Sequence, residues 1–292
     1  MNATAARNSP PPRGMGERMV NGRILRLVKG GPERRALDSG EIDAVLDRGT
    51  RTALLLPEAQ RALILAGAQP PNHLLAALPR QDYQRLLPEL EPVNLIYGEV
   101  LFEPGERLRH AYFPDSAHVS LLTVLEKGKA LEVSLVGREG MVGVPLALGV
   151  DDSPVRALVQ GSGTALRMKA AAFREALARS APLQREMYRY AYDKLAEARQ
   201  TAACNRFHQV EERLARWLLM TRDRVRADHF HLTHEFLADM LGVRRAGVTN
   251  AAISLQRKKL ISYRRGHISI IDRGGLAAVA CSCYEIVRKL AR

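Results

Sequence analysis

The pattern of apolar and polar positions changes along the chain. Between Glu91 and Met168 short apolar runs alternate with turn residues, and each run ends at Gly, Pro or Asp. Strands of this length, spaced about ten residues apart, predict a β-sandwich, a barrel or a jelly roll. From Ala170 onward apolar residues recur every three or four positions, which predicts helices. The expected fold class is therefore α+β, with a jelly-roll or β-roll domain followed by a helical one.

The helical part opens with a short helix over about residues 170–178 and a long one over about 182–204, with Pro182 in its first turn. A further helix is expected over about 209–226. Residues spaced by three and four predict one apolar seam along the long helix: Leu183, Met187, Tyr190 or Ala191, Leu195, Ala198 and Ala202. This seam either covers the β domain of its own chain or pairs with its copy in a coiled-coil homodimer.

The segment from Leu232 to Asp272 predicts a helix-turn-helix. Thr233 is a good N-cap for a first helix, and Gly242 ends that helix in the manner of a left-handed C-cap. A second helix begins about three residues later and continues to Lys259. Two helices joined by a turn that contains Gly form this motif. We expect four apolar residues of the second helix to be buried: Val248, Ala252, Ile253 and Leu255.

The second helix carries DNA-binding chemistry at its N-terminal end, which is the part that enters the major groove in this motif. Arginine can bind guanine and asparagine can bind adenine, each through two hydrogen bonds. Two alternating strands around Arg265-Gly266 then predict a β-hairpin, the wing of a winged helix, beside the DNA backbone. The candidate DNA-binding residues are Thr233, Arg244, Arg245, Thr249, Asn250, Arg257, Lys258, Arg264, Arg265 and His267.

The charge of the chain agrees with a polyanionic partner. The formal net charge is +13 and the pI is about 10.1. Residues 204–292 hold 17 Lys and Arg against 8 Asp and Glu, so most of the excess lies in the helix-turn-helix part. A basic patch on such a motif indicates double-stranded DNA as the partner.

Other classes of protein fit the sequence poorly. Apolar runs are too short for a membrane span, and the N-terminus lacks the apolar core of a secretory signal. We therefore expect a cytoplasmic protein with no membrane partner, and three cysteines agree with a reducing compartment. A P-loop, a nucleophile elbow and an HExxH motif are all missing, so we do not expect an enzyme.

The first 69 residues form an extension of unknown role. Residues 1–35 hold eight Lys and Arg against two Glu, which predicts a flexible basic tail. Residues 36–66 predict a small element with one or two short helices. The expected organisation is an N-terminal extension over 1–69, a β-roll over 72–180, a dimerisation helix over 182–205 and a winged helix-turn-helix over 206–292.

This ordering of elements resembles the Crp/Fnr family of bacterial regulators over about residues 72–272. The resemblance is strongest in ERLARWLL, in LTHEFLADMLGVRRAGVTNAAISLQRKKLI and in the wing segment RGHISIID. The family's recognition-helix arginine is matched by Arg245, whereas the glutamate that often reads the half-site is replaced by Ala246. The resemblance implies a transcriptional regulator that binds a palindromic operator as a homodimer, with RNA polymerase as a further partner.

The resemblance also implies a sensor role for the β-roll, which would bias the winged domains through a hinge at 203–207. Its effector pocket would include Gly143, Val144, Arg156 and Ala157. The family's glutamate for the ribose of a cyclic nucleotide is absent, and Arg156 stands one place late. The sequence thus argues against cyclic AMP and leaves the effector unknown. The alternative function is a cyclic-nucleotide-binding module that acts on a protein partner.

We expect no metal, cofactor or iron–sulfur cluster. An oxygen sensor of the Fnr type needs cysteines near its N-terminus, and no cysteine precedes Cys204. His208, His229, His231 and His234 lack a cysteine or carboxylate that would complete a convincing ligand set. Cys281 and Cys283 are expected to be partly buried thiols.

Overall fold

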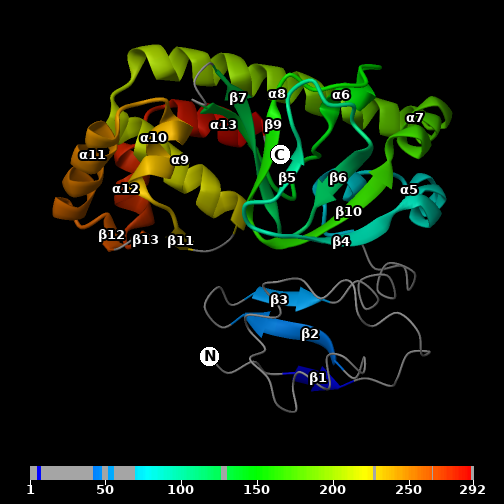
Figure 1. Ribbon diagram of the computed structural model, residues 1–292, viewed down its shortest axis with the longest axis horizontal. Coiled ribbons are helices and arrows are strands. Elements are labelled where there is room, and N and C mark those ends of the chain that lie inside the picture. The colour runs from blue at the N-terminus through cyan, green and yellow to red at the C-terminus, as the bar shows by residue number, and fades with distance from the viewer. Residues whose placement is uncertain are drawn as a thin grey trace.

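The computed structural model describes residues 5–7, 42–47, 52–55, 70–125, 130–225, 228–264 and 266–290. A β domain and a helical domain lie side by side, and helix α8 (Ala181–Phe207) runs along both of them (Figure 1). The expected α+β class is confirmed.

The β domain is built from two antiparallel sheets. One has the strand order β4-β10-β6 and the other has the order β5-β9-β7-β8. Non-sequential neighbours such as β5 and β9 are typical of a roll rather than a simple meander. The strands are β4 (Glu91–Leu95), β5 (Val100–Phe102), β6 (His110–Pro114), β7 (His118–Val124), β8 (Ala130–Val136), β9 (Arg156–Gly161) and β10 (Gly163–Lys169).

The four-stranded sheet is covered on both faces. Val119, Ala157 and Val159 belong to the apolar core of the β-roll. Leu122 and Leu158, which point to the opposite side, pack with the core of the helical domain. Successive residues of a strand alternate between the two faces, so one sheet can serve two cores. The helical domain therefore packs directly on the β-roll.

Short helices close the ends of the β-roll. Asn72 caps α4 by accepting hydrogen bonds from the amides of Leu74 and Leu75, and its amide donates to the carbonyls of Pro114 and Gly140. The buried Asn72 thus fixes the entry of the chain into the domain. These helices are α4 (His73–Ala76), α5 (Arg80–Leu86), the 3₁₀ turn η1 (Leu87–Glu89), α6 (Val144–Ala147) and α7 (Ala170–Arg179).

Helix α8 has two apolar faces, where the sequence suggested one seam. Leu183, Met187 and Tyr190 are buried in the core of the β-roll. Leu195 lies on a different face and is 48% exposed, and Tyr192 one turn before it is 63% exposed. A step of five residues turns an α-helix by about 140°, so Tyr190 and Leu195 cannot share one face. The single-seam prediction is wrong for this reason.

The break after α8 lies slightly later than predicted. Residues 203–207, expected to form a hinge, are the last helical turn of α8. The helix ends at His208, whose backbone is extended and whose amide donates to the carbonyl of Cys204. Helix α9 begins at Val210, so the bend between the two helices is confined to His208 and Gln209.

The helical domain contains the predicted helix-turn-helix and wing. The described helices are α9 (Val210–Val225), α10 (His234–Leu241), α11 (Arg245–Arg257), α12 (Arg273–Val279) and α13 (Cys283–Leu290). Strands β11 (His229–His231), β12 (Ile261–Arg264) and β13 (His267–Ile270) form an antiparallel sheet with the order β11-β13-β12.

The buried face of α11 differs from the prediction at one position. Val248, Ala252 and Leu255 are buried as expected, and Ala251 joins them. Ile253 is 43% exposed. Ile253 is two residues from Ala251 and two from Leu255, and two residues turn an α-helix by about 200°. Ile253 therefore faces outward when those two residues face the core. The expectation that Ile253 is a core residue is therefore wrong.

The N-terminal extension contains strands within its described residues. β1 (Ala5–Arg7), β2 (Ile42–Asp47) and β3 (Thr52–Leu55) form a three-stranded antiparallel sheet. The short helices expected within residues 36–66 are therefore wrong where β2 and β3 lie. Most of the predicted flexible tail, residues 1–35, lies outside the described residues.

A buried carboxylate joins the β-roll to the helical domain. Glu132 of β8 accepts hydrogen bonds from the Ser120 hydroxyl of β7 and, at 2.7 Å, from the indole N–H of Trp217 in α9. Burial raises the pKa of Glu132 to about 7, although both hydrogen bonds act to lower it. An indole N–H in a core needs a partner, and this carboxylate supplies it.

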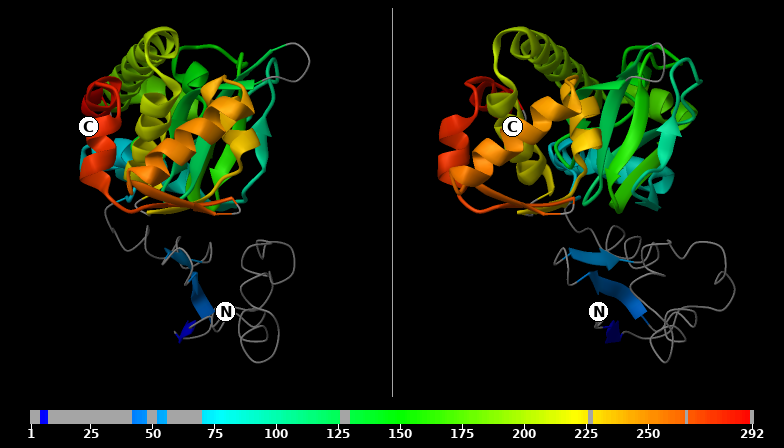
Figure 2. Two further views of the ribbon diagram at one scale, coloured as in Figure 1. Left: turned by 90° about the vertical axis from the view of Figure 1, so that its left-hand side faces the viewer. Right: turned by 60° about the vertical axis from the view of Figure 1, so that its left-hand side comes forward.

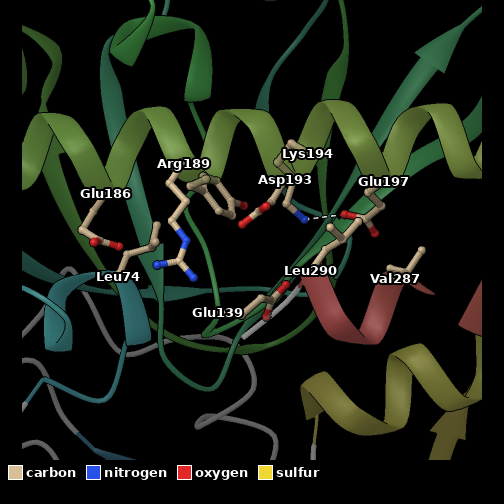
Figure 3. A pocket seen from close by; sticks show the side chains of 10 residues that line it. Leu74, Glu139, Glu186, Arg189, Asp193, Lys194, Glu197, Val287 and Leu290 are labelled. Carbon is tan, nitrogen blue, oxygen red and sulfur yellow. Dashed lines mark hydrogen bonds and ion pairs between the residues drawn. The ribbon is translucent and has the colours of Figure 1, made fainter. Parts of the chain in front are cut away.

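Ion pairs extend this junction to α8. The Arg224 guanidinium of α9 contacts Glu139 at 2.9 Å and Glu197 of α8 at 3.3 Å, and Glu197 also accepts from Lys194 at 2.6 Å. Burial alone would raise the pKa of Glu139, but the charge of Arg224 lowers it below its ordinary value. Lys194, Glu139 and Glu197 line one end of a pocket between α4, α8 and α13 (Figure 3). Removing one partner would leave the others buried and uncompensated.

None of the described helices is long and apolar enough to cross a lipid bilayer.

Leu255→Ala should destabilise the helical domain by about 2–5 kcal/mol, because Leu255 is fully buried and its truncation leaves a cavity. Ile253→Ala, on the same helix, should change the free energy of unfolding by less than about 1 kcal/mol. Urea denaturation followed by tryptophan fluorescence measures both, since Trp217 is the only tryptophan and lies in this core. Equal losses from the two variants would contradict the assigned faces of α11.

Glu132 should make the protein less stable as pH rises from about 4.5 to about 7. Its pKa is raised to about 7 in the folded chain from an ordinary 4.5, so the folded state holds its proton over that interval while the unfolded state releases it. The unfolding free energy of the wild type, taken relative to that of Glu132→Gln, should fall by about 3 kcal/mol across this range and stay constant above it. Urea denaturation of both proteins at a series of pH values, followed by the fluorescence of Trp217, measures this difference, and a constant difference between pH 4.5 and 7 would contradict the prediction.

Candidate DNA-binding interface

The turn between α10 and α11 is fixed by local capping. The Thr233 hydroxyl accepts from the amide of Phe236 at 3.1 Å and so begins α10. Gly242 ends α10 with φ +62°, and its amide bonds back to the carbonyls of Ala238 and Asp239. A side chain would be strained in this left-handed conformation. The chain then re-enters a helix at Arg245, which sets the tight crossing of the motif.

The outward face of α11 presents polar and apolar groups together. Arg244, Arg245 and Asn250 are exposed at its N-terminal end, as predicted, and Ile253 lies one turn further along. Figure 2 shows α11, drawn in orange, on the surface of the domain. Guanidinium and amide groups recognise the edges of bases, whereas an exposed aliphatic side chain can contact the thymine methyl. Ile253 is the candidate contact that the sequence analysis missed, because it was counted as core.

Arg245 already has a weak partner. Its guanidinium lies 3.9 Å from the Glu235 carboxylate of α10, and both side chains are largely exposed. An exposed ion pair at this distance stabilises little. Arg245 can therefore exchange this contact for a guanine without a large energetic cost.

Thr249 is engaged within the domain. Its hydroxyl donates to the carbonyl of Arg245 and lies 3.0 Å from Nδ1 of His234. The His234 ring stacks on Tyr263 of the wing, with centroids 4.4 Å apart and an interplanar angle of 11°. Burial lowers the pKa of His234, and the nearby Arg245 charge lowers it further. The three side chains connect α10, α11 and the wing, so Thr249 positions the interface rather than reaching outward freely.

Of three other predicted contacts, two are engaged within the domain and one is exposed as predicted. The Thr233 hydroxyl is occupied as the helix cap described above. Lys258, at the C-cap of α11, bonds Glu211 of α9 at 2.6 Å. Arg257 is exposed at the end of α11, on the side of the helix that carries Ile253.

The wing places its basic residues at the surface. Arg264 and His267 face each other across the hairpin and are both exposed. Gly266 between them has φ +81°, which suits the tight turn. Arg265, the third predicted wing contact, lies outside the described residues.

The histidines considered for a metal do not gather. His229 bonds Ser269 on the wing sheet, while His234 contacts Thr249 and Tyr263. The side chain of His231 lies outside the described residues. His208 lies at the end of α8, and its ring nitrogen is 3.5 Å from the sulfur of Cys283.

The predicted effector residues lie on two elements of the β-roll. Gly143, with φ +105°, and Val144 begin α6. Ala157 of β9 is buried in the core of the roll. Arg156 precedes it on the strand and pairs with Glu103 at 2.8 Å, so its side chain points away from the interior face that Ala157 occupies.

Family models match both parts of the chain. Residues 93–180 match the cyclic nucleotide-binding domain, and residues 212–279 match the Crp-like helix-turn-helix domain. Together the two matches cover slightly more than half of the chain and include the β-roll and the helix-turn-helix with its wing. No curated protein sequence matches the chain.

Solved structures share this architecture. FixK2 from Bradyrhizobium japonicum aligns with a TM-score of 0.58 at 15% identity, over 66% of this chain and 98% of its own. The c-di-GMP responsive global regulator CLP of Xanthomonas campestris aligns with a TM-score of 0.56 at 17% identity, over 66% of this chain and 99% of its own. TTHA1359, a transcriptional regulator of the CRP/FNR family from Thermus thermophilus, aligns with a TM-score of 0.54 at 25% identity, over 66% of this chain and 99% of its own.

The two domain matches follow the order of the β-roll and the helical domain along the chain, with the long helix α8 between them. A helix-turn-helix of this type implies DNA binding, and the family consists of transcription regulators rather than enzymes. The chain belongs to the Crp/Fnr family of DNA-binding transcriptional regulators.

Proposed function

We propose that this regulator binds a palindromic operator as a homodimer, with one α11 helix in the major groove of each half-site. The observation that carries the proposal is the exposed face of α11, where Arg244, Arg245, Asn250 and Ile253 project together. In this motif the N-terminal residues of the second helix contact base edges. The two recognition helices would then lie about 34 Å apart, one turn of DNA.

The exposed face of α8 supports the dimer. Tyr188, Tyr192 and Leu195 follow one another at steps of four and three, which places them on one side of the helix, and all three are exposed. Ala202 continues this side one heptad after Leu195. Two α8 helices can pack along such a stripe, with the alanine allowing close approach toward the winged domains.

This stripe changes the residues proposed for the dimer. Leu183, Met187 and Tyr190, predicted as dimer contacts, are buried within their own β-roll. Leu195 and Ala198 are exposed and Ala191 is half-buried, so these three stay as candidates. Tyr188 and Tyr192 are added to the proposed dimer contacts.

The β-roll is proposed to bind an effector, and this effector is not a cyclic nucleotide whose phosphate pairs with Arg156. That arginine is paired with Glu103, on the side of β9 away from the interior face of Ala157. A cyclic phosphate needs a cation that faces it. The same point weighs against the alternative function, a cyclic-nucleotide module that acts on a protein partner. RNA polymerase stays a predicted partner from the family resemblance alone.

Arg245→Ala should weaken binding to an operator selected from random DNA by about 5- to 150-fold, the equivalent of 1–3 kcal/mol, and should reduce the preference over random sequence. Arg264→Ala, on the wing, should weaken selected and random DNA by similar factors, because a phosphate contact carries no sequence information. Fluorescence anisotropy on both DNAs at fixed salt measures the two effects.

Arg179→Ala is the matched control for these two variants. Arg179 is an exposed arginine at the end of α7, at the opposite end of the molecule from α11 (Figure 1), and its loss should leave both affinities unchanged. The proposal for α11 fails if Arg245→Ala and Arg264→Ala lower the two affinities by the same factors.

Leu195→Glu should raise the dissociation constant of the dimer by at least about 100-fold. Each of the two copies would lose about 1.5–3 kcal/mol of leucine burial and place a charge in the seam. Ile271→Glu, an exposed aliphatic residue after the wing, should leave the oligomeric state unchanged. Sedimentation equilibrium distinguishes them, and a wild type that is monomeric at micromolar concentration would refute the proposed dimer.

A further inference from the structure

Four metal-binding side chains meet where α8 ends. Cys204 lies in the last turn of α8 and His208 is the C-cap of that helix, while Cys281 and Cys283 come from the junction between α12 and α13. The ligand atoms of the four side chains all lie within 4.8 Å of one another. The three cysteines are buried and His208 is half-buried. The DNA-binding function described above uses none of these residues.

The spacing of the ligand atoms suits a single tetrahedral ion. A zinc ion with Zn–S bonds of about 2.3 Å and Zn–N bonds of about 2.0–2.1 Å holds its ligand atoms roughly 3.5–3.8 Å apart. The sulfurs of Cys204 and Cys281 are 3.5 Å apart, and the sulfur of Cys283 is 3.5 Å from Nδ1 of His208. Only small side-chain rotations separate this arrangement from a closed Cys₃His site, a ligand set typical of structural zinc.

The backbone presents the four ligands in two pairs. His208, the C-cap of α8, follows Cys204 by four residues, and its amide donates to the carbonyl of Cys204, which keeps the two residues at the same end of the helix. Cys281 and Cys283 are two residues apart at the start of α13, where the amide of Tyr284 bonds the carbonyl of Cys281. Each pair is thus held by local hydrogen bonds, and the fold brings the pairs together.

Surrounding groups match the charge of a loaded site. Three thiolates and a neutral imidazole around a dication carry a net charge of −1. Arg216 of α9 is buried, and within the described residues its Nε and Nη1 have no hydrogen-bond partner. Arg216 lies close enough to Cys204 and Cys281 to interact electrostatically with both sulfurs. Gln200, one turn before Cys204, donates to the sulfur of Cys283 at 3.0 Å, as an outer-shell partner would.

We propose that Cys204, His208, Cys281 and Cys283 bind one zinc ion, which clamps the C-terminal helix α13 to the end of α8. The sequence prediction of no metal is revised here, because the ligands are separated by more than 70 residues and only the fold reveals them together. The clamp lies beside the bend at His208 and Gln209, so it would hold the winged domain in one pose relative to α8.

Two other chemistries explain less of the arrangement. A cluster of several irons would need its terminal ligands further apart, since each ligand binds a different iron. A disulfide between Cys204 and Cys281 would use two of the four groups and leave Cys283 and His208 beside it without a role. A single soft-to-borderline dication uses all four.

Elemental analysis of the full chain, purified with reductant and without chelator, should find one zinc per chain. Replacement by Co²⁺ should give the visible absorption of tetrahedral cobalt together with thiolate-to-cobalt charge-transfer bands in the near ultraviolet. In the zinc-loaded protein the three thiols should resist a thiol reagent, and they should react after a strong chelator is added. This last measurement uses the wild type, so it holds even if a ligand variant folds poorly.

Variants then assign the ligands. Cys283→Ser and His208→Gln should each weaken Co²⁺ binding by at least about 100-fold, and Gln200→Leu should weaken it by about 10- to 100-fold as an outer-shell change. His229→Gln, a surface histidine bonded to Ser269, should leave it unchanged.

Several results would overturn the proposal. These are substoichiometric zinc that does not rise on loading, a cobalt spectrum without charge-transfer bands, equal binding by Cys283→Ser and the wild type, or a Cys204–Cys281 disulfide in protein kept under reductant. None of these measurements involves DNA, so a negative result for zinc would leave the proposed operator binding untested, and the reverse also holds.

Discussion

The structure depends on the burial of one sheet between two cores. The inner face of β5-β9-β7-β8 completes the β-roll, and its outer face receives the helical domain through Leu122 and Leu158. Polar groups on the same side fix the contact, because Glu132 accepts from Trp217 and Arg224 joins Glu139 to Glu197. Buried charges of this kind tolerate little misplacement, since each needs its partner. They therefore define one orientation of the DNA-binding domain on the β-roll.

This orientation brings the β-roll close to the helix-turn-helix. The side chain of Leu131 in β8 lies against Gly242, so an added Cβ at that glycine would approach it to 2.8 Å. The turn that sets the crossing of α10 and α11 thus abuts an edge strand of the β-roll. A change at this strand would reach the recognition helix through direct packing, and an effector would drive it only through unequal affinity for two poses.

The sequence predicted the winged helix-turn-helix well because its signals are local. Thr233 and Gly242 mark the ends of α10, and both cap as expected. The errors have a common physical origin, which is that apolar spacing alone does not say what covers an apolar face. Ile253 was assigned to the core although it points outward, and Leu195 was placed in one seam with Leu183 although they lie on different faces of α8. Contacts between segments that are far apart in the sequence, such as Cys204 with Cys281, cannot be predicted from the spacing of residues along the chain.

Helix α8 also has the length that a lever between the two domains would need. Its 27 residues span about 40 Å, and its first turns are anchored in the β-roll by Leu183 and Met187. A tilt of about 5° at that anchor would displace the far end by roughly 3 Å, if the rod stays straight over its length. The winged domain begins at that far end. A small tilt of α8 in the β-roll would therefore be amplified into a shift comparable to the distance between neighbouring base pairs, provided that the ion pair between Glu197 and Arg224 rearranges with it.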